Sequence, residues 1–326
     1  MACWAALTAE AQPVPLVILT GFLGAGKTTV LNRVLGSQHR RRVAVLVNEL
    51  GRIDIDAGLI RGRAGDVLEL SGGCVCHAIG VQRELWSALE DVVRRSRPDI
   101  AILETTGLAE PDAILRGLEA LAANAPDGKG PVRASAVVTV VDAEAGLAQL
   151  QRHEEAREQV RTADRLLLSK LDRAGAERNL VDLHRRLHDL NPAAERAAFA
   201  PGDAATPGLI AWLFEPARRV ATRAGHRAGE HRHQLTAASF VDQVPLAGEA
   251  LLLVCQALGE RLVRAKGFVH LAGEPRRGFL ERAGNHTTLS LGAPWGDEAP
   301  VTRLVLIGDD LDEAALQRQL WACRVS

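Results

Sequence analysis

The sequence predicts an α/β protein with a mainly parallel sheet covered by helices on both faces, followed by a smaller α+β domain. Apolar, β-branched runs alternate with helix-like stretches through about residue 215, as in parallel sheets. The first of these runs leads directly into a glycine-rich loop. After a change in composition at residue 216, strand-like segments follow one another with few helices between them, which favours antiparallel pairing.

Each expected element follows from hydrophobic periodicity. In the first part, strands are expected at residues 14–19, 43–47, 99–103, 134–141 and 165–168, and helices from the glycine-rich loop to about 36, at 78–95, from about 111, and at 148–163. In the last part, strands are expected at 237–244, 266–271, 278–282, 286–291 and 301–307, and helices at 246–264 and 311–322.

The glycine-rich loop carries the complete phosphate-loop pattern, Gly-x-x-x-x-Gly-Lys-Thr. Its glycines allow backbone conformations closed to side chains and turn N–H groups inward, at the positive end of a helix. Lys27 adds a charge for the outer phosphates, and Thr28 offers a hydroxyl for a phosphate-bound Mg²⁺. The alternative is a chance glycine-rich turn. The pattern predicts a P-loop NTPase with these nucleotide-binding residues: Gly21, Gly24, Ala25, Gly26, Lys27, Thr28 and Thr29.

The bulk composition of the 326-residue chain excludes several classes of protein. A hydrophobic share of 47% is that of an ordinary globular protein, and 39 Lys+Arg against 40 Asp+Glu leave a formal charge of −1. This balance predicts no general attraction to nucleic acid or anionic lipid. The longest apolar runs, such as residues 134–141, are too short to span a membrane, and the first residues lack the features of a secretory signal. We therefore expect a cytoplasmic protein.

Composition also indicates the domain boundaries. Residues 216–234 are rich in Arg, Gly and His, as in an exposed linker. Its histidines, His226, His231 and His233, either collect or pass on a divalent cation or are plain polar linker residues. The expected parts are a mobile tail at 1–13, a P-loop domain at 14–215, the linker at 216–234 and the C-terminal domain at 235–326.

Two acidic residues follow buried strands, where open α/β sheets bind their ligands. Glu49 comes just after the second strand and is a candidate ligand for a metal ion or its waters; the alternative is a solvated polar loop. Glu104 ends the third strand and is expected to orient a Mg²⁺ water or the attacking water. The alternative for Glu104 is an acidic neighbour of the N-cap of the helix near Pro111.

A tight group of soft ligands, Cys74-Val75-Cys76-His77, follows two glycines. In a reducing compartment this spacing favours metal or redox chemistry over a structural disulfide. The triplet supplies at most three ligands, so a further one comes from elsewhere in the fold, from water or from a partner. Buried small residues or a redox pair are the alternatives. The other three of the five cysteines have no nearby ligand partner in the sequence.

The fifth strand is followed by Ser169-Lys170-Leu171-Asp172, a variant of the guanine-reading Asn-Lys-x-Asp pattern. A carboxylate accepts both donors on the Watson–Crick edge of guanine, whereas adenine offers an acceptor there. Asp172 is therefore expected to select GTP over ATP. Lys170 is expected to lie along the base or the phosphate-loop backbone, and Ser169 replaces the usual Asn.

The order of GFLGAGKTT, VLVNELG, SGGCVCH, ETTGLAEP, SKLD, a His-bearing linker, RAKGFVHLAG and RLVLIGDDLD resembles the CobW-type GTPases, which handle metals. The resemblance extends from about Val14 to Cys323. It implies an enzyme that hydrolyses GTP to GDP and phosphate with Mg²⁺, binds Zn²⁺ or Co²⁺, and loads that metal into a client metalloenzyme. The separate C-terminal domain is the expected site of client recognition.

The chain departs from the family pattern at two positions. His77 stands where the family usually has a third Cys, which disfavours Cu(I), and Arg52 stands where a Glu is common, so that Asp54 is a candidate replacement. The loop at 49–56 is the expected switch that couples GTP to the metal site. Two other functions remain open: a GTP-regulated binding switch without metal delivery, and an ATP-using kinase or ligase.

Overall fold

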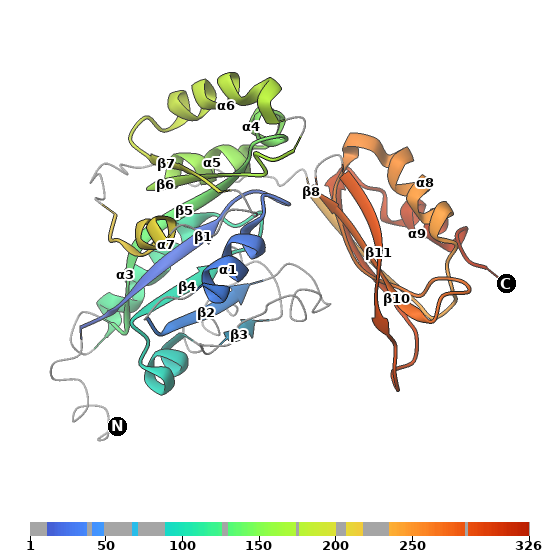
Figure 1. Ribbon diagram of the computed structural model, residues 1–326, viewed down its shortest axis with the longest axis horizontal. Helices are drawn as coiled ribbons and strands as arrows, with labels where there is room; N and C mark the ends of the chain where they lie inside the picture. Colours follow the sequence, from blue (N-terminus) through green and yellow to red (C-terminus); the bar gives the residue numbers. More distant parts are fainter. Residues whose placement is uncertain are drawn as a thin grey trace. The chain divides into compact units, whose positions relative to one another are not determined.

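The structure is a computed structural model and describes residues 12–37, 41–48, 67–70, 89–125, 130–173, 176–199, 207–217, 235–283 and 286–325. The chain divides into two compact units (Figure 1). The N-terminal unit contains the elements from β1 to α7, and the C-terminal unit contains those from β8 to α9.

The N-terminal unit is built on a seven-stranded sheet with the order β3-β2-β4-β1-β5-β6-β7, in which every pair of neighbours is parallel. Its elements are β1 (Val14–Thr20), α1 (Lys27–Gly36), β2 (Val43–Asn48), β3 (Val67–Leu70), β4 (Ile100–Glu104), α3 (Pro111–Asn124), β5 (Val132–Asp142), α4 (Gly146–Arg152), α5 (Glu154–Thr162), β6 (Arg165–Ser169), α6 (Ala176–Leu190), β7 (Glu195–Ala198) and α7 (Pro207–Phe214). Residues 89–96 are also helical. The predicted parallel sheet is confirmed.

Helices cover both faces of this sheet, because side chains of a strand point alternately to its two faces. On β1, Val17 and Leu19 join a core cluster with residues of α1 and α7. Leu16 and Ile18, from the same strand, join a second cluster with residues of α3 and with the helical stretch that contains Leu89. The sheet is thus buried between two helical layers, as the near-continuous apolar strands predicted.

The single helix expected at residues 148–163 is wrong, because the chain forms two helices, α4 and α5, separated at His153. The backbone of His153 is extended, with φ −112° and ψ 123°, and its ring stacks on that of Phe22 at 4.6 Å between centroids. A tertiary contact with the phosphate loop therefore accompanies a break that apolar periodicity did not show.

The C-terminal unit is an antiparallel five-stranded sheet with the order β11-β10-β9-β12-β8. Its elements are β8 (Leu235–Asp242), α8 (Gly248–Leu258), β9 (Leu262–Val269), β10 (Arg276–Ala283), β11 (His286–Pro294), β12 (Thr302–Asp309) and α9 (Glu313–Trp321). The expected α+β domain is confirmed. Its first helix is shorter than the predicted 246–264, since Gly259 takes a φ of 54° and the chain turns through one 3₁₀ segment into β9.

Helices α8 and α9 lie on the same side of the C-terminal sheet (Figure 1). Leu251 of α8 and Leu316 and Leu320 of α9 pack in one cluster with strand residues such as Phe240 and Leu304. Arg264, Lys266 and Phe268 of β9 alternate with the core residues Ala265 and Val269, so they lie on the other side of the sheet. One face of this sheet is therefore an apolar core, and the other carries charged and aromatic side chains, with Glu281 opposite Lys266.

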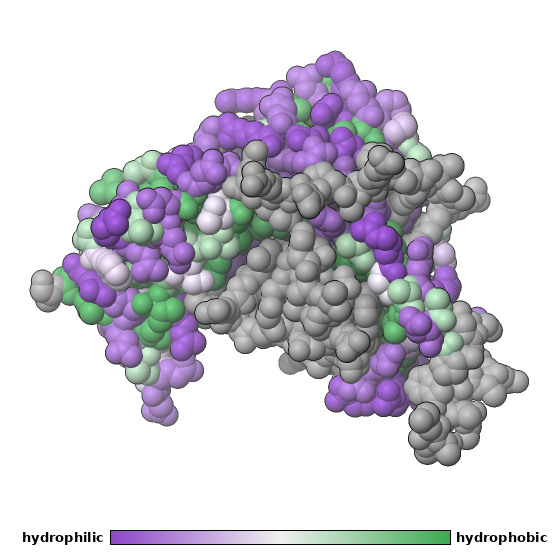
Figure 2. All heavy atoms as spheres, turned by 180° about the vertical axis from the view of Figure 1, so that it is seen from behind, coloured by the Kyte–Doolittle hydropathy of each residue, from purple (hydrophilic) through white to green (hydrophobic). Residues whose placement is uncertain are grey.

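Hydrophilic side chains cover most of the described surface in the view of Figure 2. The most exposed large apolar side chains are single residues on separate elements: Val181 of α6, Leu253 of α8 and Val241 of β8. None of the described helices combines the length with the apolar character that a membrane span requires.

Candidate functional site

The phosphate loop joins β1 to α1 and depends on glycine at defined positions. Gly21, Gly24 and Gly26 have φ values of 142°, 75° and 97°, which other residues rarely adopt. A Cβ on Gly21 would lie 2.3 Å from the carbonyl oxygen of Val140, so even an alanine collides with the backbone of β5. The amide of Val30 bonds to the carbonyl of Gly26 at 3.0 Å, so that α1 begins inside the loop. The expected start of the helix is confirmed.

Lys27 is the first residue of α1, and its side chain lies inside the loop. It is 6% exposed, and its Nζ donates to the carbonyls of Gly21 at 2.7 Å and Phe22 at 3.4 Å. The ammonium group is therefore held at the mouth of an anion-binding helix N-terminus. Thr29 follows on α1, and Ala25 precedes Gly26 in the loop.

Thr28 and Glu104, 76 residues apart in the sequence, meet beside the loop. The Thr28 hydroxyl donates to Oε1 of Glu104 at 2.7 Å, and Glu104 is 4% exposed. The contact follows from the sheet topology, because β1 and β4 are parallel neighbours with Leu19 opposite Glu104. A buried carboxylate and a hydroxyl thus converge where the strand ends meet the first turn of α1.

The loop after β4 packs directly on the phosphate loop. The hydroxyl of Thr105 donates to that of Thr20 at 3.0 Å, and a Cβ on Gly107 would lie 2.7 Å from the backbone nitrogen of Leu23. Gln159 of α5 is 1% exposed and donates to the carbonyls of Gly107 at 3.0 Å and Ala109 at 3.1 Å. This positioning role of Gln159 was not predicted, because the sequence shows a polar residue in a helical stretch but not that its side chain is buried.

The Ser-Lys-Leu-Asp segment leaves β6 next to the phosphate loop. The hydroxyl of Ser169 donates to the carbonyl of Ala25 at 2.6 Å, so it contacts the loop backbone. Nζ of Lys170 pairs with Oδ2 of Asp142 at 2.7 Å, a partner that the sequence did not predict, and the backbone of Lys170 has a φ of 57°. Asp172 is exposed two residues later.

Asp142 organises the neighbouring turn. Its Oδ1 accepts from the amides of Glu144 at 2.9 Å and Ala145 at 3.0 Å, while its Oδ2 pairs with Lys170. It lies opposite Ser169 in the pairing of β5 with β6. One buried carboxylate therefore ties the end of β5 to the segment that follows β6.

The candidate metal ligands Glu49, Cys74, Cys76 and His77 lie outside the described residues, as do Arg52, Asp54 and the linker histidines. The strands that lead to them are described. Leu70, the last residue of β3, is the register partner of Asn48 at the end of β2, and Val47 is the partner of Glu104. Within the described ranges, no group of three His, Cys, Asp or Glu side chains is placed to hold a metal ion.

Comparison with known proteins agrees with this two-part architecture. Residues 15–197 match the model of the CobW/HypB/UreG nucleotide-binding domain, and residues 235–324 match that of the cobalamin synthesis protein CobW C-terminal domain. The chain belongs to the CobW family. The family resemblance predicted from the order of the motifs is confirmed.

Named relatives of this CobW-family chain match along nearly their whole length. The zinc chaperone CobW of Pseudomonas aeruginosa is 33% identical, over 94% of this chain and 90% of that protein. The zinc chaperone YjiA of Escherichia coli is 31% identical, over 94% of this chain and 97% of that protein. The crystal structure of Zn(II)-bound YjiA GTPase from E. coli matches with 26% identity and a TM-score of 0.47, over 97% of this chain and 100% of that chain.

Proposed function

We propose that this CobW-family chain is a GTP-hydrolysing metallochaperone that binds Zn²⁺ or Co²⁺ at Cys74, Cys76 and His77 and transfers the ion to a client metalloprotein. The contact between Thr28 and Glu104, at 2.7 Å beside the phosphate loop, carries the nucleotide half of this proposal. The metal half is supported by the cysteine motif and by relatives that are named zinc chaperones.

The loop fits a nucleoside triphosphate. Its positive-φ glycines and the N-terminus of α1 supply N–H donors, and Lys27 brings its charge to the same place. On binding, Lys27 exchanges the carbonyls of Gly21 and Phe22 for phosphate oxygens. Gly24, Ala25, Gly26 and Thr29 complete the cradle with their backbone. The hydrogen bond from the Ser169 hydroxyl to the carbonyl of Ala25 ties the loop backbone to the end of β6.

Thr28 and Glu104 fit Mg²⁺, because this ion prefers a hydroxyl or carboxylate oxygen together with several waters. When bound, Mg²⁺ neutralises charge that develops on the transferred phosphoryl group. The bond of Glu104 to Thr28 favours a role on the cation side, where the two side chains would hold Mg²⁺ or orient its waters, over a role as the group that places the attacking water. Lys27, Thr28 and Glu104 are thus the proposed catalytic residues.

The segment after β6 supplies the proposed base contact. Asp172 is exposed and therefore accessible to a guanine ring. Lys170 holds the turn before it through the ion pair with Asp142, which is only 2% exposed. The positive φ of Lys170 redirects the chain immediately before Asp172. This arrangement supports GTP over ATP as the nucleotide.

Metal binding is proposed to respond to GTP through residues 49–56 and 71–77. Both segments follow strands, β2 and β3, that end at the same edge as Glu104. When GTP orders residues 49–56, Cys74, Cys76 and His77 come into a geometry that binds the metal ion. Glu49 serves as an additional ligand of that ion. By linkage, if GTP tightens metal binding, the metal tightens GTP binding by the same factor.

Competition of the protein with a chromophoric Zn²⁺ chelator tests the coupling. We expect affinity to be highest with a non-hydrolysable GTP analogue, lower with GDP and lowest without nucleotide. The double variant Cys74→Ser/Cys76→Ser is expected to lose the dependence on nucleotide, while Cys3→Ser serves as the matched control. Equal Zn²⁺ affinities in all three nucleotide states refute the coupling, and unchanged Zn²⁺ binding by the double variant supports a GTP-regulated binding switch in which the cysteines are structural.

A further inference from the structure

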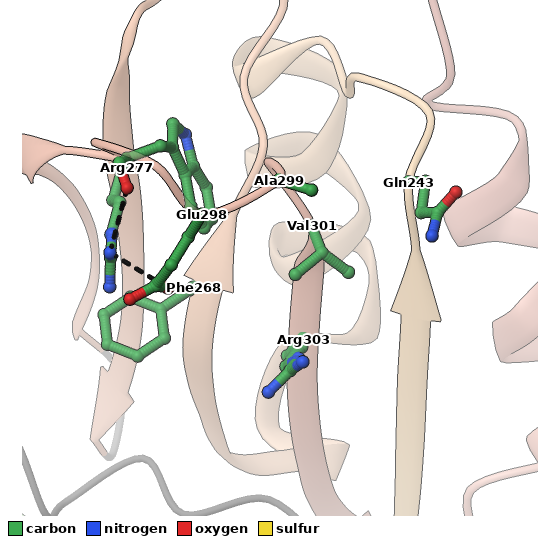
Figure 3. Close-up of a pocket in the computed structure, with 8 residues that line it drawn as sticks. Gln243, Phe268, Arg277, Glu298, Ala299, Val301 and Arg303 are labelled. Carbon is green, nitrogen blue, oxygen red and sulfur yellow. Dashed lines mark hydrogen bonds and ion pairs between the residues drawn. The ribbon is translucent and has the colours of Figure 1, made fainter.

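The C-terminal unit contains a pocket of about 380 Å³ at one end of its sheet (Figure 3). No motif in the sequence marks it, and the proposed nucleotide and metal chemistry does not use it. Its wall combines aromatic with donor side chains, and its principal lining residues are Gln243, Phe268, Arg277, Trp295 and Arg303.

Sheet register brings these residues together from distant parts of the chain. Arg303 of β12 lies directly opposite Phe268 of β9, so the two side chains share a face of the sheet. Gln243 follows the end of β8, beside β12. Arg277 lies where the register between β10 and β11 shifts, and Trp295 follows β11. The shift places Arg277 beside the loop after β11.

Aromatic rings fix the side chain of Arg277. Its guanidinium carbon is 5.0 Å from the ring centroid of Trp295 and 5.9 Å from that of Phe268. Its Nη2 contacts Oε2 of Glu298 at 3.0 Å and the carbonyl of Trp295 at 3.4 Å, the two interactions dashed in Figure 3. A guanidinium held between rings loses little freedom when it binds a ligand.

The pocket has more hydrogen-bond donors than acceptors. Among the described residues, the buried Nε of Arg277 and the buried indole Nε1 of Trp295 have no hydrogen-bond partner, and Trp295 is 7% exposed. Arg303 adds an exposed guanidinium, and Gln243 adds an amide. Of the described residues that line the pocket, Glu298 is the carboxylate, and its side chain is 70% exposed. Because Glu298 already pairs with Arg277, the excess positive charge is that of Arg303, which favours an anion, and the buried unpaired N–H groups of Arg277 and Trp295 favour an acceptor.

We propose that this pocket binds an acidic side chain of a partner protein, within a short segment that also places an apolar residue against Phe268 and Val301. The pocket volume of about 380 Å³ is near the lower end of the range for small-ligand pockets, about 300–1,000 Å³, and this leaves room for a few side chains. A nucleic acid is disfavoured because a chain of formal charge −1 lacks the basic excess that holds a phosphate backbone. The identification of the partner as the client metalloprotein rests on the proposed function. The preference of the pocket for a carboxylate is independent of that function.

Indole N–H signals of the full-length chain labelled with ¹⁵N-tryptophan test the proposal, because the chain has only five tryptophans. The Trp295→Phe spectrum assigns the signal of Trp295. The probe is an end-blocked peptide with a central glutamate between leucines, and its control has glutamine at that position. We expect the glutamate peptide to shift the Trp295 signal saturably, and the glutamine peptide to bind at least about tenfold more weakly because charge-assisted bonds are the stronger ones.

Variants of two arginines localise the contact. Arg303→Gln is expected to weaken binding of the glutamate peptide about tenfold or more. Arg276→Gln is the matched control, because Arg276 precedes Arg277 on β10 but pairs with Glu274 at 2.9 Å instead of lining the pocket. It is expected to leave the affinity unchanged. Circular dichroism spectra confirm that both variants remain folded.

Several results overturn the proposal: no shift of the Trp295 signal, equal affinities for the glutamate and glutamine peptides, or an unchanged affinity of Arg303→Gln. A stronger response to inorganic phosphate or to a short single-stranded oligonucleotide also overturns it. These outcomes are separable from failure of the metallochaperone function, which the chelator competition measures independently. Peptide binding without GTP-dependent Zn²⁺ affinity assigns the pocket to a partner other than a metal client.

Discussion

Each unit of this CobW-family chain buries one lysine to the same degree, and the two environments differ. Lys27 in the N-terminal unit and Lys266 in the C-terminal unit are both 6% exposed. Lys27 lies in a loop of backbone dipoles and donates to the carbonyl of Gly21 at 2.7 Å. Lys266 lies within a sheet, on β9 between Glu281 of β10 and Val305 of β12, and burial lowers its pKa to about 8.

The difference shows two ways of building a polar site. In the N-terminal unit the geometry is fixed by backbone: glycine dihedrals, strand ends and a helix N-terminus. In the C-terminal unit polar groups project from separate strands and are held by side chains, as Arg277 is held by aromatic rings. We therefore expect substitutions of the phosphate-loop glycines to abolish GTP binding, and substitutions of single polar side chains to cause graded changes.

The largest effect is expected for Gly21→Ala. The added Cβ collides with the backbone of Val140 at 2.3 Å, and a φ of 142° is unfavourable for alanine. We expect a loss of stability of about 3 kcal/mol and loss of GTP binding. Gly36→Ala is the control, because nothing lies within 4 Å of a Cβ at that helix position. Urea denaturation measures the stability of each variant, and titration with a fluorescent GTP measures its GTP affinity. Normal GTP binding by Gly21→Ala contradicts the conclusion that the backbone fixes the geometry of the loop.

A second test changes charge and keeps shape. Glu104→Gln retains an oxygen that accepts from Thr28 but loses the negative charge next to the proposed cation position. We expect kcat for GTP hydrolysis to fall about 100-fold or more, since removal of one electrostatic contact costs that much, with GTP affinity changed only a few-fold. Phosphate release under saturating GTP gives the rate. Glu119→Gln, exposed on α3, is expected to match the unmodified chain.

These two tests concern residues that sequence patterns could find, and the rest of the site shows why others were missed. The phosphate loop is contiguous, and its backbone requirements appear as glycines in fixed positions. The contacts of Ser169 with Ala25 and of Gln159 with Gly107 join residues 144 and 52 positions apart. Such contacts follow from the packing of α5 and β6, which periodicity alone does not specify.

The C-terminal pocket was harder still to predict. Its residues come from strands β9, β10 and β12 and from the loops that follow β8 and β11, and only the register of the sheet places Arg303 opposite Phe268. The sequence predicted five strands and two helices there with shifted bounds, but not which strands are neighbours. The roles of Cys74, Cys76 and His77 remain predictions from the sequence, because these residues lie outside the described ranges.

Base selection is expected to show a smaller effect than catalysis. Asp172→Asn removes the carboxylate that would accept both guanine donors. We expect GTP affinity to fall about 10-fold to 100-fold, because a bidentate contact to a base contributes about 1–3 kcal/mol of discrimination. ATP affinity should stay the same, so the preference disappears. The affinities are measured by the displacement of a fluorescent nucleotide from the site by GTP or ATP. Asp189→Asn, on the exposed side of α6, is the control. Tighter binding of ATP than of GTP by the unmodified chain indicates an ATP-using enzyme.

The smallest effect is expected for the pH dependence that Lys266 gives to the C-terminal unit. Burial is the main cause of its lowered pKa of about 8, against an ordinary value of 10.5, and Glu281 partly opposes the shift. Between these pH values the unfolded chain binds a proton that the folded chain has released, so the free energy of unfolding rises with pH. Below about pH 8 both states are protonated, and the folded state bears the cost of burying the charge, less what Glu281 offsets.

Lys266→Met is therefore expected to stabilise the C-terminal unit at pH 7 by on the order of 1–3 kcal/mol, a gain that vanishes as the pH approaches 10.5. Urea denaturation at a series of pH values, followed through the indole signal of Trp295, isolates the transition of this unit. Arg318→Met, exposed on α9, is the control and should leave the slope unchanged. Parallel pH profiles for Lys266→Met and the unmodified chain mean that the Lys266 ammonium is as well stabilised within its sheet as in water. The two buried lysines then differ in what surrounds them and not in what their charge costs.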